Sequence, residues 1–196
     1  TKVLDIHGHM SAPGAIHTFV ATMMASNTAR PSPLEFIEKP GNAFDAHIRE
    51  RESAGLGDED FMKTNTEHVK LLDDRQIDMQ VIGPRPYLMM GWMEPHLLPA
   101  WTRFVNDCIH KQVRNFPDRF FGAAQLPQIS SAPDLSHCIP ELERCVNDLG
   151  FVAAYVSPDP AGRRTTPGMQ EPYWYPLYEK CEKMDIPLIV HGTNSL

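Results

Sequence analysis

Several features that would place this chain in a special class are missing from its 196 residues. No apolar stretch approaches the ~18 residues that span a membrane, and no signal peptide precedes the first motif, which begins at Asp5. No basic run offsets the net charge of −7, which argues against a nucleic-acid partner. A small anionic ligand is still compatible with this charge, because it needs only a few local arginines or lysines.

The sequence also lacks the common cysteine-pair and glycine-rich motifs. The cysteines are spread along the chain without a C-x-x-C pair, at Cys108, Cys138, Cys145 and Cys181. This spacing argues against a disulfide framework or a zinc–thiolate site and predicts a reducing, cytoplasmic location. Neither a G-x-G-x-x-G turn nor a P-loop is present, which weakens the case for a nucleotide-binding fold.

What the chain has instead is an alternation of short apolar runs and helical patterns. A first strand ends at His9, and further strands are expected at 79–82, 120–126, 151–156 and 186–190. Helical spacings of apolar residues lie between them, at 65–75, 97–115, 136–149 and 174–184. This order predicts βα units of the α/β class, in either an open doubly wound sheet or a (β/α)₈ barrel.

The barrel is favoured because polar residues follow successive strands, where barrel enzymes carry their sites. Five strands do not close an eight-stranded barrel, so the chain is expected to cover about the first five βα units. Residues 1–196 are thus read as the N-terminal part of one barrel domain, with the rest supplied by a longer protein or a partner. Residues 11–64 are expected to form a long loop that serves as a lid or specificity element.

The most informative motif is Asp5-Ile6-His7-Gly8-His9 at the end of the first strand. Alternate side chains of a strand point to the same side, so His7 and His9 face one way. His191 ends the last apolar run and is expected to point to the same barrel mouth, completing three imidazole ligands of a metal. The alternatives are surface histidines at 7 and 9 and a buried, hydrogen-bonded His191. Asp5 is a candidate fourth ligand or a group that orients an imidazole.

Two rigid loops offer candidate substrate contacts. Arg85 stands between two prolines in Gly83-Pro84-Arg85-Pro86, which fixes the direction of its guanidinium and suits it to hold a carboxylate. A structural ion pair is the alternative role for Arg85. Asp159, in Ser157-Pro158-Asp159-Pro160, either binds substrate or caps a turn.

Five stretches, in order, resemble the amidohydrolase-related branch of the amidohydrolase superfamily: DIHGHMSAP, DMQVIGPRPYLMM, FFGAAQLPQ, YVSPDP and YWYPLYEKCEKMDIPLIVHGTNS. That branch includes aminocarboxymuconate-semialdehyde decarboxylase and aromatic-acid decarboxylases, and the resemblance is closest to its 4-oxalomesaconate hydratase subgroup. The resemblance implies that His7, His9 and His191 bind the metal and that Arg85 holds a substrate carboxylate. It also implies that Thr193 and Ser195 lie beside the metal, and it puts the acid–base residue beyond Leu196.

The resemblance predicts a metal-dependent hydratase that adds water to an unsaturated oxo-polycarboxylic acid from aromatic acid breakdown. A non-oxidative decarboxylase, a metal-dependent hydrolase and a non-catalytic subunit of a heteromeric relative are the alternatives. The expected cofactor is a divalent metal, zinc first, with manganese or iron as alternatives. The expected partners are a small anionic carboxylic acid and further copies of the chain, with neither nucleic acid nor membrane.

Overall fold

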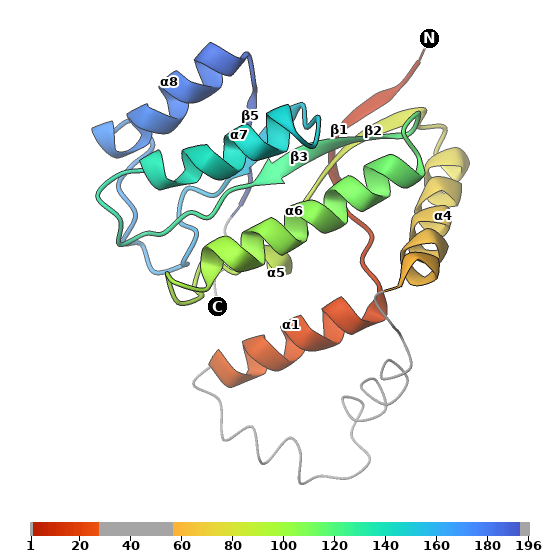
Figure 1. The fold of residues 1–196 in the computed structure, drawn as a ribbon, viewed down its shortest axis with the longest axis horizontal. Coiled ribbons are helices and arrows are strands. Elements are labelled where there is room, and N and C mark those ends of the chain that lie inside the picture. The colour runs from red at the N-terminus through yellow and green to blue at the C-terminus, as the bar shows by residue number, and fades with distance from the viewer. Residues whose placement is uncertain (1, 28–56, 193–196) are drawn as a thin grey trace, which may run out of the picture. The chain divides into compact units, whose positions relative to one another are not determined.

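The computed structural model describes residues 2–27 and 57–192, which divide into two compact units (Figure 1). One unit is formed by Thr1–Met10 with Leu71–Leu196, and the other by Ser11–Lys70. The assignment of both units to a single barrel domain stays a prediction.

The first unit is built on a sheet of five parallel strands in the order of the sequence, β1-β2-β3-β4-β5. Their bounds are Leu4–His9, Met79–Gly83, Phe120–Gln125, Ala153–Val156 and Leu188–Val190. A doubly wound sheet reverses its strand order part-way across, whereas a barrel adds each strand beside the last. The uninterrupted order therefore confirms the barrel-type arrangement, and each expected strand is present within a few residues.

Helices connect these strands, as the apolar spacings predicted (Figure 1). Their bounds are Pro86–Met89 (α5), Leu98–Asn115 (α6), Ile139–Asn147 (α7) and Tyr175–Met184 (α8), with short 3₁₀ turns at Ser136–Cys138 and Pro172–Trp174. Each of these α-helices has a proline at its first or second residue. The backbone N–H groups there have no partner within the helix, so the missing N–H of proline loses no hydrogen bond. Gly150, which follows α7, has a φ of 70°, a left-handed conformation that glycine adopts without strain.

The second unit corrects the prediction of a long loop at 11–64. It contains α1 (Gly14–Asn27) and most of α4 (Asp58–Asp74), so His17 lies on a helix, and α4 begins before the expected residue 65. Helix α1 is rich in alanine and methionine, which favour helix, but its apolar residues do not recur at a clear helical period. The middle of the expected loop, with proline-rich stretches at 30–33 and 39–41 of the sequence, lies outside the described residues.

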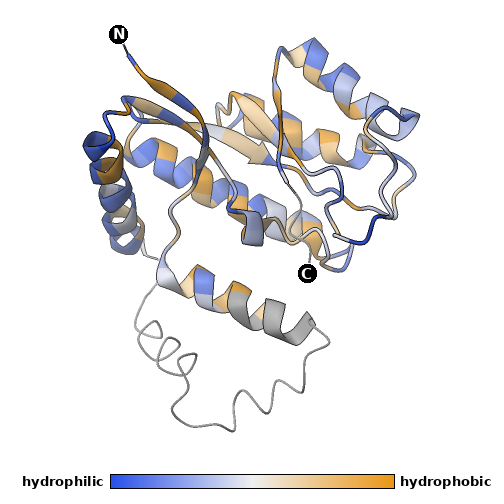
Figure 2. Cartoon of the chain, turned by 180° about the vertical axis from the view of Figure 1, so that it is seen from behind, coloured by the Kyte–Doolittle hydropathy of each residue, from blue (hydrophilic) through white to orange (hydrophobic). Residues whose placement is uncertain are grey.

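Burial differs sharply between the inner and the edge strands. Val81, Ala123, Ala153 and Tyr155 form a buried cluster on β2, β3 and β4. On the edge strand β1, by contrast, Ile6 is 65% exposed. Figure 2 shows the strands largely in hydrophobic colours and the helices α6 and α7 in both colours. The helices thus place an apolar side on the sheet and a polar side toward solvent.

The four cysteines are all buried, and each carries a free thiol in this structure. No helix in residues 2–27 and 57–192 is long and apolar enough to cross a membrane.

Candidate metal centre and adjoining cavity

Three histidines from the two edge strands of the sheet come together at its carboxyl end. Their ligand nitrogens all lie within 4.8 Å of one another, in His7, His9 and His191. The ring centroids are 5.2–5.3 Å apart in every pair. Strands β1 and β5 stand at opposite ends of the strand order, so only a curved sheet can bring their ends together. The structure therefore assembles the three imidazoles that the sequence singled out.

Two of these imidazoles are oriented by backbone carbonyls. His9 donates from Nδ1 to the Pro84 carbonyl at 2.8 Å, and His191 donates from Nδ1 to its neighbour Gly192 at 2.8 Å. Because a carbonyl only accepts, the proton of each neutral ring sits on Nδ1 and the Nε2 lone pair is left to bind a metal. Burial, with the nearby charges of His191, His7 and Arg85, lowers the pKa of His9, although the bond to Pro84 opposes this shift. The neutral, metal-binding form of His9 is thereby favoured.

Asp5 does not join the three imidazoles. Its Oδ1 accepts the backbone N–H of His7 at 3.0 Å and its Oδ2 accepts the side-chain amide of Gln80 at 2.6 Å. The pairing of β1 with β2 shifts between Asp5 and Gly8, so the strand carries a β-bulge there. Of the two roles considered for Asp5, this arrangement supports the orienting one.

Tyr155, on β4, lies against all three histidines and was read in the sequence only as part of an apolar strand. It is fully buried, and its ring centroid is 5.7–6.3 Å from each imidazole centroid. Its hydroxyl donates to the Gly8 carbonyl at 3.2 Å. Burial, and secondarily the charge of Asp5, raises the pKa of Tyr155 to about 12, so this hydroxyl stays a donor at neutral pH.

Arg85 lies beside the histidines, at the start of α5. Its Nε donates to the Met10 carbonyl at 2.9 Å, which anchors the guanidinium and leaves its Nη groups to meet a ligand. A cavity extends from Pro86, which follows Arg85, to Gly192, which follows His191. Its walls are mostly apolar and include Met89, Met90, Trp92, Leu126, Gln128 and Ser157. Arg85 and His191 are thus each followed by a residue that lines this cavity.

Comparisons with known proteins agree with this geometry. A model of the amidohydrolase family matches residues 4–195. The chain belongs to the amidohydrolase family. It is 30% identical over 98% of its length to 2-keto-4-carboxy-3-hexenedioate hydratase of Sphingobium sp., of which it covers 52%.

Two solved structures show the same fold. The 4-oxalomesaconate hydratase of Rhodopseudomonas palustris superposes with a TM-score of 0.74 at 30% identity, over 97% of this chain and 52% of that one. A dihydroxybenzoic acid decarboxylase of Polaromonas sp., with bound manganese and the inhibitor 2-nitroresorcinol, superposes with a TM-score of 0.62 at 22% identity. That match covers 100% of this chain and 51% of the decarboxylase. The chain thus spans about half the length of the relatives it matches.

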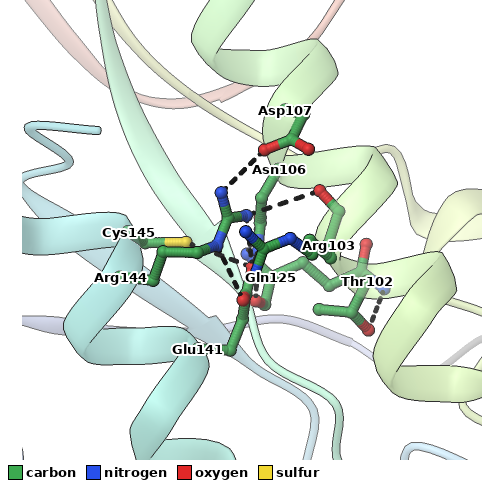
Figure 3. Close-up of polar contacts among 8 residues, drawn as sticks. All are labelled: Thr102, Arg103, Asn106, Asp107, Gln125, Glu141, Arg144 and Cys145. Atoms are coloured by element: carbon green, nitrogen blue, oxygen red, sulfur yellow. Dashed lines mark hydrogen bonds and ion pairs between the residues drawn. The ribbon is translucent and has the colours of Figure 1, made fainter. Parts of the chain in front are cut away.

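In this amidohydrolase a network of hydrogen bonds between β3, α6 and α7 supports one wall of the cavity. Gln125, at the end of β3, donates from its side chain to the Met89 carbonyl at 3.0 Å. Asn106 on α6 makes two hydrogen bonds to the Gln125 backbone, at 2.8 and 3.0 Å. Glu141 on α7 accepts from Asn106 at 2.8 Å and from two nitrogens of Arg144 at 2.7 and 2.9 Å (Figure 3). The Glu141–Arg144 ion pair within α7 thereby holds Asn106 of α6, which fixes the end of β3 beside the cavity.

A second amide lies in the cavity wall itself. Gln128 accepts the backbone N–H of Ser157 at 2.8 Å and donates to the Ser157 carbonyl at 3.0 Å, so it joins the ends of β3 and β4. Asp159 accepts the backbone N–H of Arg164 at 2.7 Å and closes a turn, while its other oxygen is buried without a hydrogen-bond partner among the described residues. Thr193 and Ser195 lie outside the described residues.

Proposed function

We propose that this chain carries the metal-binding part of a hydratase that adds water to an unsaturated oxo-polycarboxylic acid, such as 4-oxalomesaconate. The observation that carries the proposal is the convergence of three imidazoles beside Arg85 in a chain that resembles a hydratase over nearly its whole length. The activity of the whole protein is part of this proposal, because the chain covers 52% of that relative.

The residues present fit a divalent metal. Neutral imidazole nitrogens suit zinc, manganese and iron alike, and hydrogen bonds to Pro84 and Gly192 leave Nε2 available on two of the rings. A divalent ion held by His7, His9 and His191 supplies Lewis acidity where the strand ends meet the cavity. We keep zinc as the first expectation, and the manganese bound in the decarboxylase relative supports manganese as the alternative.

Arg85 is assigned to a substrate carboxylate. Its anchored Nε leaves a planar pair of Nη donors, the geometry that carboxylates accept in two parallel bonds. Apolar side chains in the cavity wall, among them Met89, Trp92 and Leu126, suit the carbon skeleton of such a substrate. Asp159, Thr193 and Ser195 stay proposals as further substrate contacts.

A non-oxidative decarboxylase is the second candidate, favoured by the decarboxylase whose fold matches the whole of this chain. The two reactions leave different products in oxygen-18 water. We expect the complete enzyme, given an unsaturated oxo-polycarboxylic acid, to place one labelled oxygen on carbon and to release no carbon dioxide. Carbon dioxide release without labelled oxygen on carbon would contradict the hydratase reaction and support the decarboxylase reaction.

A cytoplasmic location and a homo-oligomeric assembly belong to the same proposal. Four free cysteines support a reducing compartment. Size-exclusion chromatography with light scattering tests the assembly: a mass above that of one chain is expected, and a monomer would contradict it.

A further inference from the structure

The three imidazoles rest on one aromatic ring. Tyr155 lies on β4, and its ring centroid is 5.8 Å from that of His7, 6.3 Å from His9 and 5.7 Å from His191. The tyrosine ring therefore lies at a similar distance from all three imidazoles. The ring is fully buried, so it also shields one side of the cluster from water.

The hydroxyl of Tyr155 reaches the backbone between the two histidines of β1. It donates to the Gly8 carbonyl at 3.2 Å. The carboxylate of Asp5 accepts the backbone N–H of His7, one residue earlier, at 3.0 Å. Side chains thus hydrogen-bond to two backbone groups of the bulge, the His7 N–H and the Gly8 C=O, where the regular pairing with β2 is interrupted. A bulge re-aims the side chains next to it, so its fixation decides where the imidazoles of His7 and His9 point.

Space for this ring depends on a missing side chain at the end of β2. A Cβ on Gly83, at the end of β2, would lie 2.2 Å from Cε2 of Tyr155. No real contact is that short, so any larger residue at position 83 would push the tyrosine ring toward or away from the histidines. Tyr155 on β4 and Gly83 on β2, two strands apart in the sheet, are therefore packed against each other.

We propose that Tyr155 is a positioning residue for the metal: its ring supports all three imidazoles and its hydroxyl fixes the β1 bulge that aims two of them. The inference rests on the proposed function, because it concerns the same metal site. It goes beyond that function in assigning metal affinity to a residue whose hydroxyl is bonded to the Gly8 carbonyl and which acts through the imidazoles.

The test compares two tyrosines that make the same kind of bond. Tyr173 donates its hydroxyl to the Ile129 carbonyl at 3.2 Å, like Tyr155 to Gly8, but has no contact with the histidines. Tyr155→Phe and Tyr173→Phe therefore delete equal hydrogen bonds. Zn²⁺ affinity is measured by competition with a chromophoric chelator, alongside the thermal unfolding midpoint and the visible spectrum of the Co²⁺-loaded protein.

We expect Tyr155→Phe to weaken Zn²⁺ binding by roughly 10-fold, the lower end of effects seen for groups that orient ligands, and to change the Co²⁺ spectrum. Tyr173→Phe should alter neither, although both variants lower the unfolding midpoint. Unchanged affinity in Tyr155→Phe, or an equal loss in Tyr173→Phe, would overturn the inference. A wild-type protein without metal affinity would overturn the proposed function as well, which distinguishes the two failures.

A second pair of variants tests the position of the Tyr155 ring instead of its hydroxyl group. In Gly83→Ala the new methyl group meets Tyr155 at 2.2 Å. In Gly122→Ala, on β3, it meets Phe151 at 2.3 Å, just before β4 and away from the His7–His9–His191 cluster. The two substitutions impose the same steric conflict on a folded sheet. Loss of Zn²⁺ affinity in Gly83→Ala alone supports the positioning role of Tyr155, and equal losses in both variants contradict it.

Discussion

The carboxylate of Asp5 accepts the backbone N–H of His7 at 3.0 Å, so Asp5 fixes the strand that carries a candidate ligand without entering the ligand cluster. The carboxylate also accepts from Gln80 across to β2, at 2.6 Å. An aspartate on the same strand, two residues before His7 and four before His9, would be a plausible ligand by type alone. Its hydrogen bonds instead make it part of the support of the site.

Two substitutions of Asp5 separate these roles. Asp5→Leu removes both acceptors and should weaken metal binding by about 10–100-fold. Asp5→Asn keeps an oxygen for the His7 N–H, and the amide of Gln80 can turn to accept from it, so most of the affinity should remain. Equal losses in both variants, measured by metal titration of the apoprotein, would instead make the Asp5 carboxylate a metal ligand.

Arg85→Met should raise the KM for a polycarboxylate substrate and leave the metal content unchanged. The loss of charge-assisted hydrogen bonds is worth about 1.5–3 kcal/mol, or roughly 10- to 100-fold in KM. Arg114→Met, at the exposed end of α6, removes the same charge away from the cavity and serves as the control. An unaltered KM in Arg85→Met would remove Arg85 from the substrate contacts.

The partly buried Glu141–Arg144 ion pair predicts how stability depends on pH. Burial opposes the ionisation of Glu141, but hydrogen bonds from Arg144 and Asn106 outweigh it and lower the pKa of this carboxyl. A carboxyl with a lowered folded-state pKa stabilises the fold above its unfolded pKa, about 4.3 for glutamate, and this contribution is lost as the pH falls through the folded value.

Glu141→Gln should therefore flatten the acid limb of the stability profile. The difference in unfolding free energy between wild type and variant is expected to be largest near neutral pH and to shrink below about pH 4, since the wild-type carboxyl then becomes protonated. Urea denaturation at a series of pH values gives this profile. A difference that stays constant from pH 7 to pH 3 would show that the charge of Glu141 contributes nothing.

The strands and the histidine cluster could be predicted because their signals are local. Apolar runs closed by glycine and proline mark the strands, and a two-residue spacing puts His7 and His9 on one side of β1. The end of an apolar run likewise placed His191 at the mouth of the sheet. The helices α6 and α8 carried clear helical spacings and were located to within a residue or two.

The rest depends on contacts between segments far apart in the sequence. Tyr155 looks like any other residue of a buried strand until the sheet brings it under Gly8, 147 residues earlier in the chain. The bulge in β1 is held by Asp5 and Gln80, a pairing that strand periodicity does not encode. Helix α1 was missed because its alanines and methionines favour helix without producing a periodic apolar pattern.

Metal stoichiometry in the His191→Ala variant tests the three-histidine site most directly, because His191 comes from a different edge of the sheet than His7 and His9. His96→Ala removes an exposed histidine from a loop outside the cluster and is the matched control. Apoproteins titrated with Zn²⁺ or Mn²⁺ and analysed for bound metal should hold one equivalent in the wild type and in His96→Ala. His191→Ala should hold none under the same conditions, whereas a full equivalent retained by His191→Ala would contradict the site.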